Sequence, residues 1–384
     1  MSAERLRVLI IGAGLGGLTL ASLLRQRGDR FDLKVFERDP SAHARPQGYS
    51  ISLKDPGGLV PLRRLGLYDE VRTYSSVVET FTILTQNGRE LVTLSEDPTS
   101  PQVSLRVPRK ELRDALLRGL RADVSFGETC TGYAQEPDTP IVTFASGKAV
   151  DADLVVGCDG VHSAIRRQMV GDRRHYLGIA SIQGRCGEPP PSLPLEGGPV
   201  MVLGHGSTLF LLKAEQGVGW SLATHAPEKQ FDGLSQVALK EHALAAMRGW
   251  APKFENVVGG SDPTTLLSLG GFYDKEPLHK ARTQSIVLLG DAAHPMSPLR
   301  GEGANTAMLD ALVLADALVK SGANLEAALS SYEHEMLQRS RKYVLLSRKT
   351  AREMHSTSWW VQCVRNAKLR VANFFMKRHR RPSG

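Results

Sequence analysis

The sequence predicts an α/β fold: a discontinuous domain built on a parallel sheet, a mainly antiparallel-sheet domain inserted into it, and a C-terminal helix. Three observations predict this arrangement. A strand–helix–strand pattern opens the chain at residues 7–37. Two later apolar strands, at 153–156 and 285–289, are each followed within three residues by an aspartate. The chain between those two strands is rich in strand-like segments, which indicates an insertion.

The opening pattern is a βαβ unit. Residues 7–11 (RVLII) form a short apolar run ended by glycine, which is typical of a buried parallel strand. Residues 15–27 have the apolar spacing of a helix, and residues 31–37 (FDLKVFE) form the second strand. This unit predicts that the parallel sheet begins at the N-terminus.

The middle of the chain predicts mostly antiparallel sheet. Asn87-Gly88 separates two strand-like runs, 81–84 and 90–94, which is a strong hairpin signal. A helix is expected at 110–120 before the strand at 153–156. Further strands are expected at 179–185, 200–203, 209–213 and 219–224, followed by a helix at 234–247.

The last third of the chain returns to the first domain and then becomes helical. Residues 285–289 (SIVLL) have the texture of a buried parallel strand, and 305–320 that of a long helix. Residues 330–354 continue as a second long helix rich in Arg and Lys.

Composition and charge narrow the classes of function. The 384 residues are 41% apolar and 23% charged, which is typical of a globular protein of about two domains. The net charge is +8, but residues 336–384 contain 13 Lys and Arg against one acid, Glu353. That segment carries +12 and the remaining 335 residues −4. We therefore expect no nucleic-acid-binding surface on the main fold.

The cysteine spacing and the N-terminal segment indicate in which cellular compartment the protein is expected. Cys130, Cys158, Cys186 and Cys363 are far apart, without a CxxC pair or a Cys/His cluster. This spacing predicts no metal site and no disulfide framework, and it fits the reducing cytoplasm. Residues 6–24 contain four glycines and lack a signal-peptidase-like site, so we interpret them as strand, turn and helix.

The segment Gly12-Ala13-Gly14-Leu15-Gly16-Gly17 matches the GxGxxG pattern between the first strand and the first helix. Gly12 permits a tight turn, Gly14 lets a diphosphate approach the backbone, and Gly17 lets helix and strand pack closely. Glu37 ends the second strand 20 residues later, where an acid can accept hydrogen bonds from ribose hydroxyls. A carboxylate there would repel a 2′-phosphate, so the site favours FAD or NAD over NADP.

Two strand-end segments carry the other aspartates. Gly157-Cys158-Asp159-Gly160, with Ser163 and Arg166 after it, follows one buried strand. Gly290-Asp291-Ala292-Ala293-His294-Pro295 follows the other. Open α/β sheets bind ligands at the carboxyl ends of their strands. Each aspartate could instead cap the following turn, and His294 could be a structural histidine.

Together these three motifs resemble the class A flavoprotein monooxygenases, the p-hydroxybenzoate-hydroxylase-like family that includes short tetracycline-inactivating members. The resemblance extends over about residues 6–330 and continues through Pro298, Gly301, Gly303, Asn305 and Asp310. It implies a discontinuous Rossmann-like FAD-binding domain at 1–75, 105–172 and 280–330. A substrate domain would occupy 76–104 and 173–279, and a C-terminal helical segment with a basic tail would occupy 331–384.

The resemblance also implies roles for individual residues. Gly12, Gly14 and Gly17, with Leu15 at the start of the helix, would hold the FAD pyrophosphate. Glu37 would bind the adenosine ribose with Arg38 beside it, Arg109 and Arg45 would reach the cofactor, and Asp159 belongs to the second cofactor motif. Asp291 would bond the ribityl chain. The isoalloxazine would be lined by Pro298, Gly301, Gly303, Ala304 and Asn305.

The implied reaction uses NAD(P)H and O2. NAD(P)H reduces FAD, the reduced flavin forms a C4a-hydroperoxide with O2, and an aromatic or polyketide-like small molecule is hydroxylated or epoxidised. The protein binds and orients these groups, so no catalytic side chain is assigned. A same-fold FAD reductase or dehydrogenase and a non-catalytic flavin-binding protein remain alternatives. A monomer or weak dimer is expected.

Substrate contacts are expected from the inserted sheet. Its apolar candidates are Met201, Phe210, Leu212, Trp220 and Phe272, for which ordinary core packing is the alternative. His205 and His225 could meet a substrate hydroxyl. Glu302 stands where many relatives have Gln, and a carboxylate beside a reduced anionic flavin is unfavourable unless it points away or is protonated.

The basic C-terminus has two interpretations. Trp359, Trp360, Phe374 and Phe375 alternate with basic residues, which is typical of an amphipathic helix in weak contact with an anionic membrane. The alternative is a helix packed on the protein, with a solvated basic end.

Overall fold

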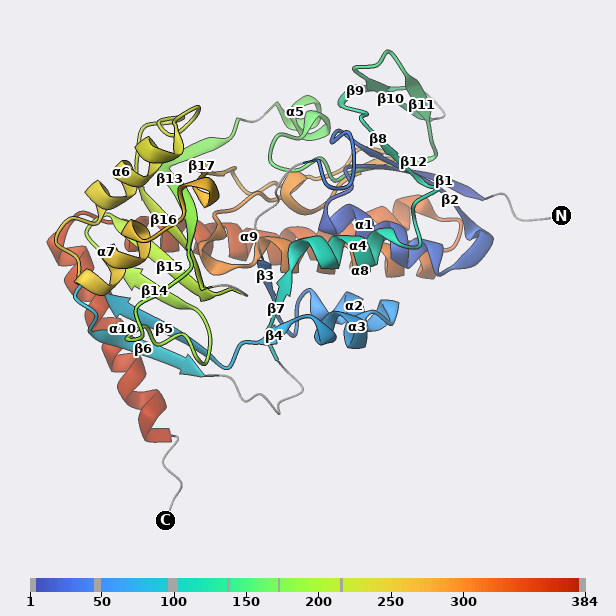
Figure 1. The fold of residues 1–384 in the computed structure, drawn as a ribbon. Helices are drawn as coiled ribbons and strands as arrows, with labels where there is room; N and C mark the ends of the chain where they lie inside the picture. The colour runs from blue at the N-terminus through green and yellow to red at the C-terminus, as the bar shows by residue number, and fades with distance from the viewer. Residues whose placement is uncertain are drawn as a thin grey trace. The chain divides into compact units, whose positions relative to one another are not determined.

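The computed structural model describes residues 5–44, 50–95, 103–136, 139–171, 173–214 and 217–379, without the side chains of 378 and 379. The chain forms two compact units (Figure 1). The first unit comprises residues 1–76, 104–175 and 273–348, and the second comprises 77–103, 176–272 and 349–384.

A five-stranded parallel sheet forms the centre of the first unit, in the order β18-β12-β1-β2-β8. Its central strands are almost entirely apolar because both faces of the sheet are covered. The strands are β1 (Leu6–Ile11), β2 (Phe31–Glu37), β8 (Val124–Phe126), β12 (Leu154–Gly157) and β18 (Ile286–Leu288).

Different elements cover the two faces of this sheet (Figure 1). One face carries α1 (Leu15–Arg25), α4 (Arg109–Leu117) and α8 (Gly303–Lys320). The other carries α5 (Ala164–Val170) and an antiparallel meander. The meander strands are β9 (Cys130–Gln135), β10 (Pro140–Phe144) and β11 (Ala149–Asp151).

Smaller elements complete the first unit. A three-stranded sheet has the order β3-β7-β4. Long helix α9 (Leu325–Met354) begins in the first unit and ends in the second. The other elements are η1 (Gly28–Arg30), β3 (Ser50–Leu53), α2 (Leu59–Leu65), α3 (Tyr68–Thr73), β4 (Ser76–Val77), β7 (Leu105–Pro108), η3 (Gly290–Ala292) and η4 (Pro298–Arg300).

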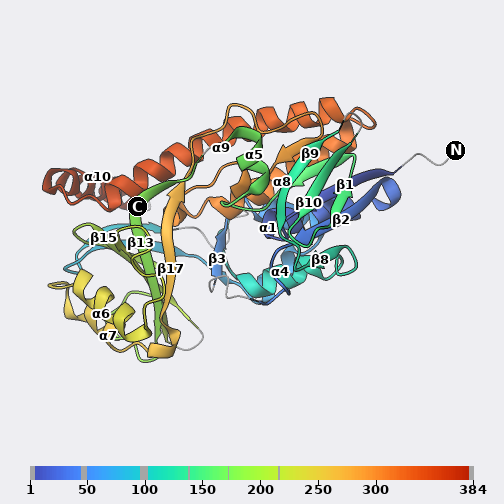
Figure 2. The same cartoon turned by 90° about the horizontal axis from the view of Figure 1, so that it is seen from above.

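The second unit is built on a seven-stranded sheet in the order β17-β13-β16-β15-β14-β5-β6, mostly antiparallel, with β14 and β5 parallel. Helices α6 and α7 pack on one face, and α10 runs along the other (Figures 1 and 2). The elements are β5 (Thr80–Thr85), β6 (Glu90–Ser95), β13 (His175–Cys186), β14 (Val200–Leu203), β15 (Ser207–Lys213), β16 (Val218–His225), α6 (Gln236–Ala246), α7 (Pro252–Gly259), η2 (Pro263–Thr265), β17 (Leu267–Asp274) and α10 (Trp359–His379).

The predicted fold class is confirmed: a discontinuous α/β region with a parallel sheet, an inserted mainly antiparallel sheet and C-terminal helices. The strands at 130–151 escaped prediction because β9 and β11 are half-exposed and polar, without an apolar run. Among the described helices, none combines the length and the apolar character needed to cross a membrane.

Candidate cofactor site

The loop between β1 and α1 has no room for side chains on its inner side. Gly12 has φ +109°, and a Cβ on it would lie 2.4 Å from the carbonyl oxygen of Cys158. A Cβ on Gly17 would lie 2.1 Å from the Gly12 oxygen, so strand and helix touch here. Gly14, the N-cap of α1, has open space where its Cβ would be. The loop therefore presents bare backbone and the first N–H groups of α1, beginning at Leu15.

Glu37 at the end of β2 is buried and bonded to this loop. Its Oε2 accepts from the Ala13 N–H at 2.7 Å, and its Oε1 accepts from the Asp39 N–H at 3.0 Å. A carboxylate oxygen accepts more than one hydrogen bond, so both atoms keep capacity for a ligand. The neighbouring Arg38 is exposed. Arg45, also predicted here, lies outside the described residues.

Asp159 follows β12 and combines both predicted roles. Its Oδ2 accepts at 2.7 Å from the N–H of Ala164, the first residue of α5, whose N-cap is Ser163. Its Oδ1 is buried and has no hydrogen-bond partner within the described part of the chain. Burial raises the pKa of Asp159, against the hydrogen bonds from Ser163 and α5. An orphaned carboxylate oxygen at a strand end is where a ligand donor is expected.

Arg166 on α5 ties the two aspartate segments together. Its side chain is fully buried, and its Nη1 donates to the carbonyl oxygens of Ala292 (3.3 Å) and Ala293. Its Nη2 donates to the Glu276 oxygen at 3.1 Å. The turn that carries Asp291 is thus fixed to α5, the helix whose first N–H is bound by Asp159.

Asp291 is exposed, yet protein surrounds it on its other sides. This partial desolvation raises the pKa of its carboxyl, while the charges of His294 and Arg109 lower it. A Cβ on Gly303 would lie 3.6 Å from Asp291 Oδ1, which places the carboxylate at the start of α8. Open surface combined with desolvation is expected where a carboxylate lines a ligand site.

Arg109, at the start of α4, carries a desolvated guanidinium group. Desolvation lowers its pKa, and the charge of Asp291 raises it. Within the described residues it makes no hydrogen bond or ion pair. Nearby Arg106 donates to the hydroxyls of Ser50 (2.8 Å) and Ser52 (3.2 Å), and burial lowers its pKa to about 10. Two desolvated guanidinium groups at one place favour an anionic ligand.

The start of α8 faces no capping side chain. The first N–H bonded within the helix is that of Thr306, to Glu302 oxygen at 2.8 Å, so the N–H groups of Gly303 and Ala304 precede the ladder. Gly301 has φ +65° and ends η4, which begins at the exposed Pro298. Two glycines here leave the backbone open to a ligand.

Asn305 is buried and holds this corner in place. Its Oδ1 accepts from the N–H groups of Lys54 (2.9 Å) and Gly58 (2.8 Å). Its Nδ2 donates to the carbonyl oxygens of Ser52 and Gly301, both at 2.9 Å. All four contacts are with the chain itself, so Asn305 positions the neighbouring backbone.

Lys54, which follows β3, pairs with Glu302, whose negative charge would be unfavourable beside a reduced flavin. Its Nζ lies 2.7 Å from Glu302 Oε1 and donates to the Arg300 oxygen at 3.2 Å. The carboxylate beside the α8 N-terminus is therefore neutralised by an ion pair. Lys54 could not be predicted from the sequence, because no pattern links the loop after β3 to a residue 248 positions later.

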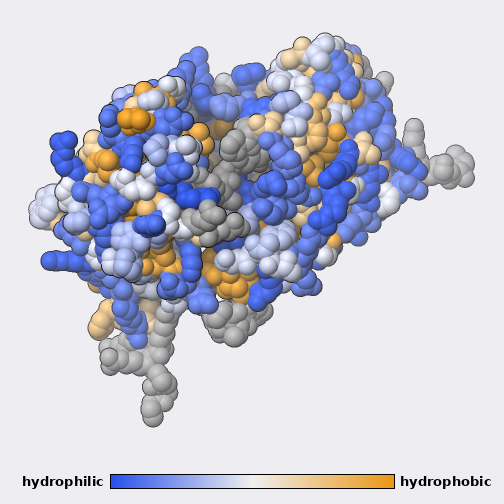
Figure 3. Space-filling view, viewed as in Figure 1, coloured by the Kyte–Doolittle hydropathy of each residue, from blue (hydrophilic) through white to orange (hydrophobic). Residues whose placement is uncertain are grey.

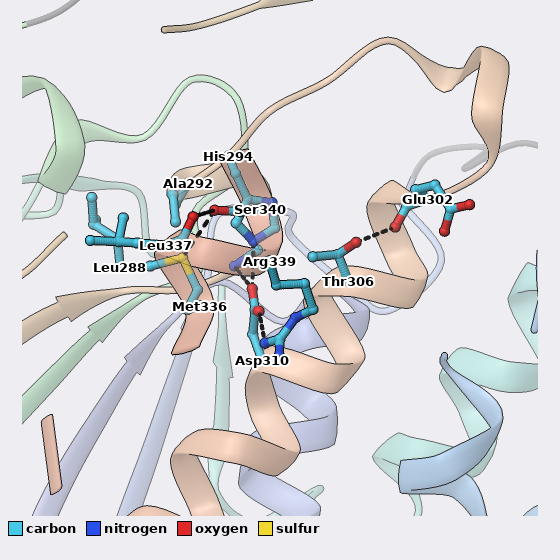
Figure 4. A network of polar contacts seen from close by, with 12 residues as sticks. Leu288, Ala292, His294, Glu302, Thr306, Asp310, Met336, Leu337, Arg339 and Ser340 are labelled. Carbon is cyan, nitrogen blue, oxygen red and sulfur yellow. Dashed lines mark hydrogen bonds and ion pairs between the residues drawn. The ribbon is translucent and has the colours of Figure 1, made fainter. Parts of the chain in front are cut away.

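Behind the Asp291 turn lies a buried charged network (Figure 4). Asp310 on α8 accepts from the His294 ring at 2.5 Å, from Arg339 Nη2 at 2.8 Å and from the Gly290 N–H at 3.2 Å. Asp310 and His294 are at most 2% exposed, and His294 Nδ1 has no partner among the described residues. The network anchors both ends of the turn that carries Asp291.

The five apolar substrate candidates do not form one wall. Met201 pairs with Phe210 across β14 and β15, and both contact the cluster beneath α10. Trp220 pairs with Leu211, lies in the core under α6 and α7, and donates to Ser261 Oγ at 2.7 Å. Because side chains alternate along a strand, Trp220 faces away from Leu212. Phe272 on β17 is half-buried.

The two histidine candidates are held by backbone and helix contacts in the second unit. His225 Nε2 lies 2.5 Å from the His355 oxygen, and its Nδ1 lies 3.1 Å from the Gly178 oxygen. His205 Nδ1 lies 2.9 Å from Gln362 Nε2 on α10. Both histidines are exposed.

The three strand-end loops of the first unit come together at one edge of the parallel sheet. The Cys158 N–H donates to the Ile11 oxygen at 2.7 Å, so the loops after β1 and β12 are neighbours. The sheet order changes direction at this point, because β2 and β12 flank β1 on opposite sides. Parallel α/β sheets bind dinucleotides at such a switch point. Bare backbone, an orphaned carboxylate oxygen and the desolvated guanidinium group of Arg109 suit a diphosphate with hydroxyl-bearing arms.

Comparison with known proteins agrees with this site. The protein-family model described as FAD binding domain matches residues 5–183 and 275–347. The 3-amino-4-hydroxybenzoate 2-monooxygenase of Streptomyces cremeus is 31% identical, over 91% of this chain and 88% of that protein. The aurachin C monooxygenase/isomerase of Stigmatella aurantiaca is 30% identical, over 88% and 87%. The crystal structure of Klebsiella pneumoniae HpxO complexed with FAD and uric acid has a TM-score of 0.83 and 26% identity, covering 95% and 93%.

Proposed function

The chain belongs to the FAD binding domain family of FAD-dependent monooxygenases, and from this premise we propose that it hydroxylates or epoxidises an aromatic or polyketide-like small molecule with NAD(P)H and O2. It is an oxidoreductase, with FAD as its cofactor and a small molecule as its substrate. The named relatives act on an aminohydroxybenzoate and on aurachin C, and the HpxO structure contains uric acid. These ring compounds support the substrate class.

One observation carries the proposal: the glycine loop, Asp159 and Asp291 with the α8 N-terminus meet at one edge of a single parallel sheet. We assign FAD binding to residues 1–75, 105–172 and 280–330, and substrate binding to 76–104 and 173–279. The open space at Gly14 and the orphaned Asp159 Oδ1 fit a bound dinucleotide. Bound FAD supplies the two-electron chemistry and the activation of O2.

The residues of the chain bind and orient the cofactor in this proposal. Backbone N–H groups at Gly14 and Leu15 hold the pyrophosphate, together with the dipole of α1. Glu37 takes the ribose hydroxyls, with Arg38 beside it, and Arg109 supplies positive charge. Gly12 and Gly17 let the loop close at van der Waals distance.

The start of α8 and the turn before it would hold the ribityl chain and the isoalloxazine of FAD. Asp291 bonds the ribityl hydroxyls, and Pro298 and Gly301 line the isoalloxazine. The N–H groups of Gly303 and Ala304, which precede the hydrogen-bond ladder of α8, would donate to the isoalloxazine, because oriented donors stabilise negative charge. Asn305 holds this backbone in position through its four hydrogen bonds.

A substrate screen tests the function. Purified holoenzyme is mixed with NADH or NADPH and a panel of phenolic, quinoid and tetracyclic compounds. A substrate should raise the rate of NAD(P)H oxidation, and ¹⁸O from ¹⁸O2 should appear in the product. Reduction without label would identify a reductase or dehydrogenase, and no oxidation with any compound would identify a flavin-binding protein.

A substitution tests the site separately from the substrate. Asp291→Ala should lose FAD during purification or lose most substrate-dependent activity. Asp32→Ala, which changes an exposed acid on β2, is the matched control and should stay yellow and active. A fully yellow and active Asp291→Ala protein would refute the site.

Two attributes remain proposals beside the reaction. The four cysteines are free, which agrees with a reducing compartment, and we place the protein in the cytoplasm. We further propose that it is a monomer or weak dimer.

A further inference from the structure

Helix α10 has two apolar faces, and the sheet of the second unit covers one of them. Leu369 and Met376 pack against the cluster formed by Ile83, Leu91, Val92, Met201 and Leu203. Asn373 Nδ2 and Lys377 Nζ donate to Glu90 Oε1 at 2.9 and 2.8 Å. Arg365 is buried and donates to the carbonyl oxygens of Glu353 and Met354, the end of α9. This face therefore fixes α10 on the unit.

The opposite face of α10 is apolar and exposed. Its side chains recur at positions three and four apart, so they form one stripe along the helix. They are Trp360, Val364, Val371, Phe374 and Phe375, from 50% to 71% exposed, with Trp359 at 63% beside them. In Figure 3, pale orange side chains lie at the surface over the C-terminal half of α10. Such a run of large exposed apolar residues marks an interaction surface.

Basic residues line this stripe on both sides. At about 100° per residue, Lys368 lies along one edge, and Arg370 and Lys377 lie along the other. Residues 354–384 contain seven Lys and Arg and no Asp or Glu. Long basic side chains at the edge of an apolar face can extend their charges past it while their stems stay in apolar surroundings.

The basic residues on both edges of the stripe indicate what kind of partner binds it. A second copy joined through this face by two-fold symmetry would place α10 against α10, basic edge against basic edge, without an acid in the segment. A partner with an apolar interior and a negatively charged surface would contact the stripe with its interior and the two basic edges with its surface. The headgroup and acyl boundary of a bilayer with anionic lipids has this character, and aromatic rings such as Trp favour that depth.

We propose that α10 binds the surface of anionic lipid bilayers, with its axis in the membrane plane and the aromatic stripe immersed. The stripe supplies apolar contact, and Lys368 and Arg370 hold the anionic headgroups. The inference is independent of the proposed reaction, because no residue of α10 belongs to the cofactor site.

Vesicle co-sedimentation of the full-length holoenzyme tests the surface. We expect binding to vesicles of phosphatidylcholine mixed with phosphatidylserine, weaker binding in high salt, and little binding to phosphatidylcholine alone. Replacing Trp360, Phe374 and Phe375 together by Ala preserves helix propensity and should lower the partition coefficient about tenfold or more. Val237→Ala, at a 62% exposed residue of α6, is the matched control and should bind like the wild type.

A probe on α10 provides a second readout. Cys363 is exposed, Cys186 is buried, and burial raises the thiol pKa of Cys130 and Cys158, so a thiol-reactive fluorophore should label Cys363 first. Anionic vesicles should shift its emission to the blue. Absence of both sedimentation and shift, equal binding by the triple variant, or a dimer that the triple variant abolishes without lipid binding would each overturn the proposal. FAD content should be the same in all variants, which separates this test from that of the enzyme.

Discussion

His294 and Asp310 form a buried ion pair, with 2.5 Å between His294 Nε2 and Asp310 Oδ2. Burial opposes both charges, but the carboxylate raises the pKa of His294, and the imidazolium lowers that of Asp310. Arg339 adds a second positive partner at 2.8 Å. The fold therefore stores a charged pair directly behind the turn that presents Asp291.

Breaking this pair should destabilise the first unit. Asp310→Asn removes the carboxylate that His294 and Arg339 share and leaves Arg339 with only its ion pair to Glu335. Removing one member of a buried pair costs about 3–5 kcal/mol. Urea unfolding of the variant should show that loss, with a lower FAD content. Asp316→Asn changes a half-exposed acid on the same helix, paired only with surface arginines, and serves as the control, which should lose little.

The same pair predicts a dependence on pH. Because the folded pKa of His294 lies above its ordinary value of 6.5, its contribution to stability is complete below pH 6.5 and is lost as pH rises through the folded pKa. The wild type should lose stability over that upper range, and Asp310→Asn should not. Parallel curves for both proteins would contradict this assignment.

His355 in the second unit predicts the opposite trend. Burial lowers its pKa from 6.5 to about 4, so the folded protein holds it neutral while the unfolded chain binds a proton below pH 6.5. The free energy of unfolding should fall by about 3 kcal/mol as pH drops from 6.5 to 4, since each pKa unit is worth about 1.4 kcal/mol. His355→Gln should flatten that part of the curve, as measured by denaturant midpoints.

Two glycines of the first loop should respond differently to alanine. Gly17→Ala places a Cβ 2.1 Å from the Gly12 oxygen, so the apoprotein itself should be destabilised by about 1–3 kcal/mol. Gly14→Ala meets no protein atom within 4 Å, and the stability of the apoprotein should stay near that of the wild type. Its methyl group would occupy the approach of the pyrophosphate, so its affinity for FAD should fall at least tenfold, measured by flavin titration. Equal FAD affinity for Gly14→Ala and the wild type would remove the pyrophosphate from this loop.

The Lys54–Glu302 pair should influence the flavin potential. Lys54→Met leaves the Glu302 carboxylate uncompensated beside the ring proposed at the α8 N-terminus, so reduction should become harder. We expect a midpoint potential about 30 mV lower, equivalent to about 1.4 kcal/mol for two electrons. The double variant Lys54→Met/Glu302→Gln removes both charges and should return close to the wild-type value. An unchanged potential in both proteins would place the pair away from the flavin.

The rule that parallel sheets bind ligands at the carboxyl ends of their strands predicted the main parts of the candidate site from the sequence. Gly12, Asp159 and Asp291 each follow an apolar run, and the structure places their loops at one edge of the sheet. Lys54 and Arg106 could not be found this way, because they reach the site through tertiary contacts of β3 and β7 that leave no periodic signal. The sequence cannot separate Trp220 from Met201, because it shows alternation within a strand but not which face of the sheet each side chain occupies.

The order in which the first unit is assembled has a consequence for synthesis. Strand β12 ends at Gly157, but its partner β18 begins at Ile286, after all seven strands of the second unit's sheet have been made. Chains emerge from the ribosome N-terminus first, and domains tend to fold as units. The inserted sheet can therefore form while the parallel sheet still lacks its edge strand, Asp291 and the Asp310 anchor. FAD loading should accordingly be a late event, which follows translation of α8 and most of α9.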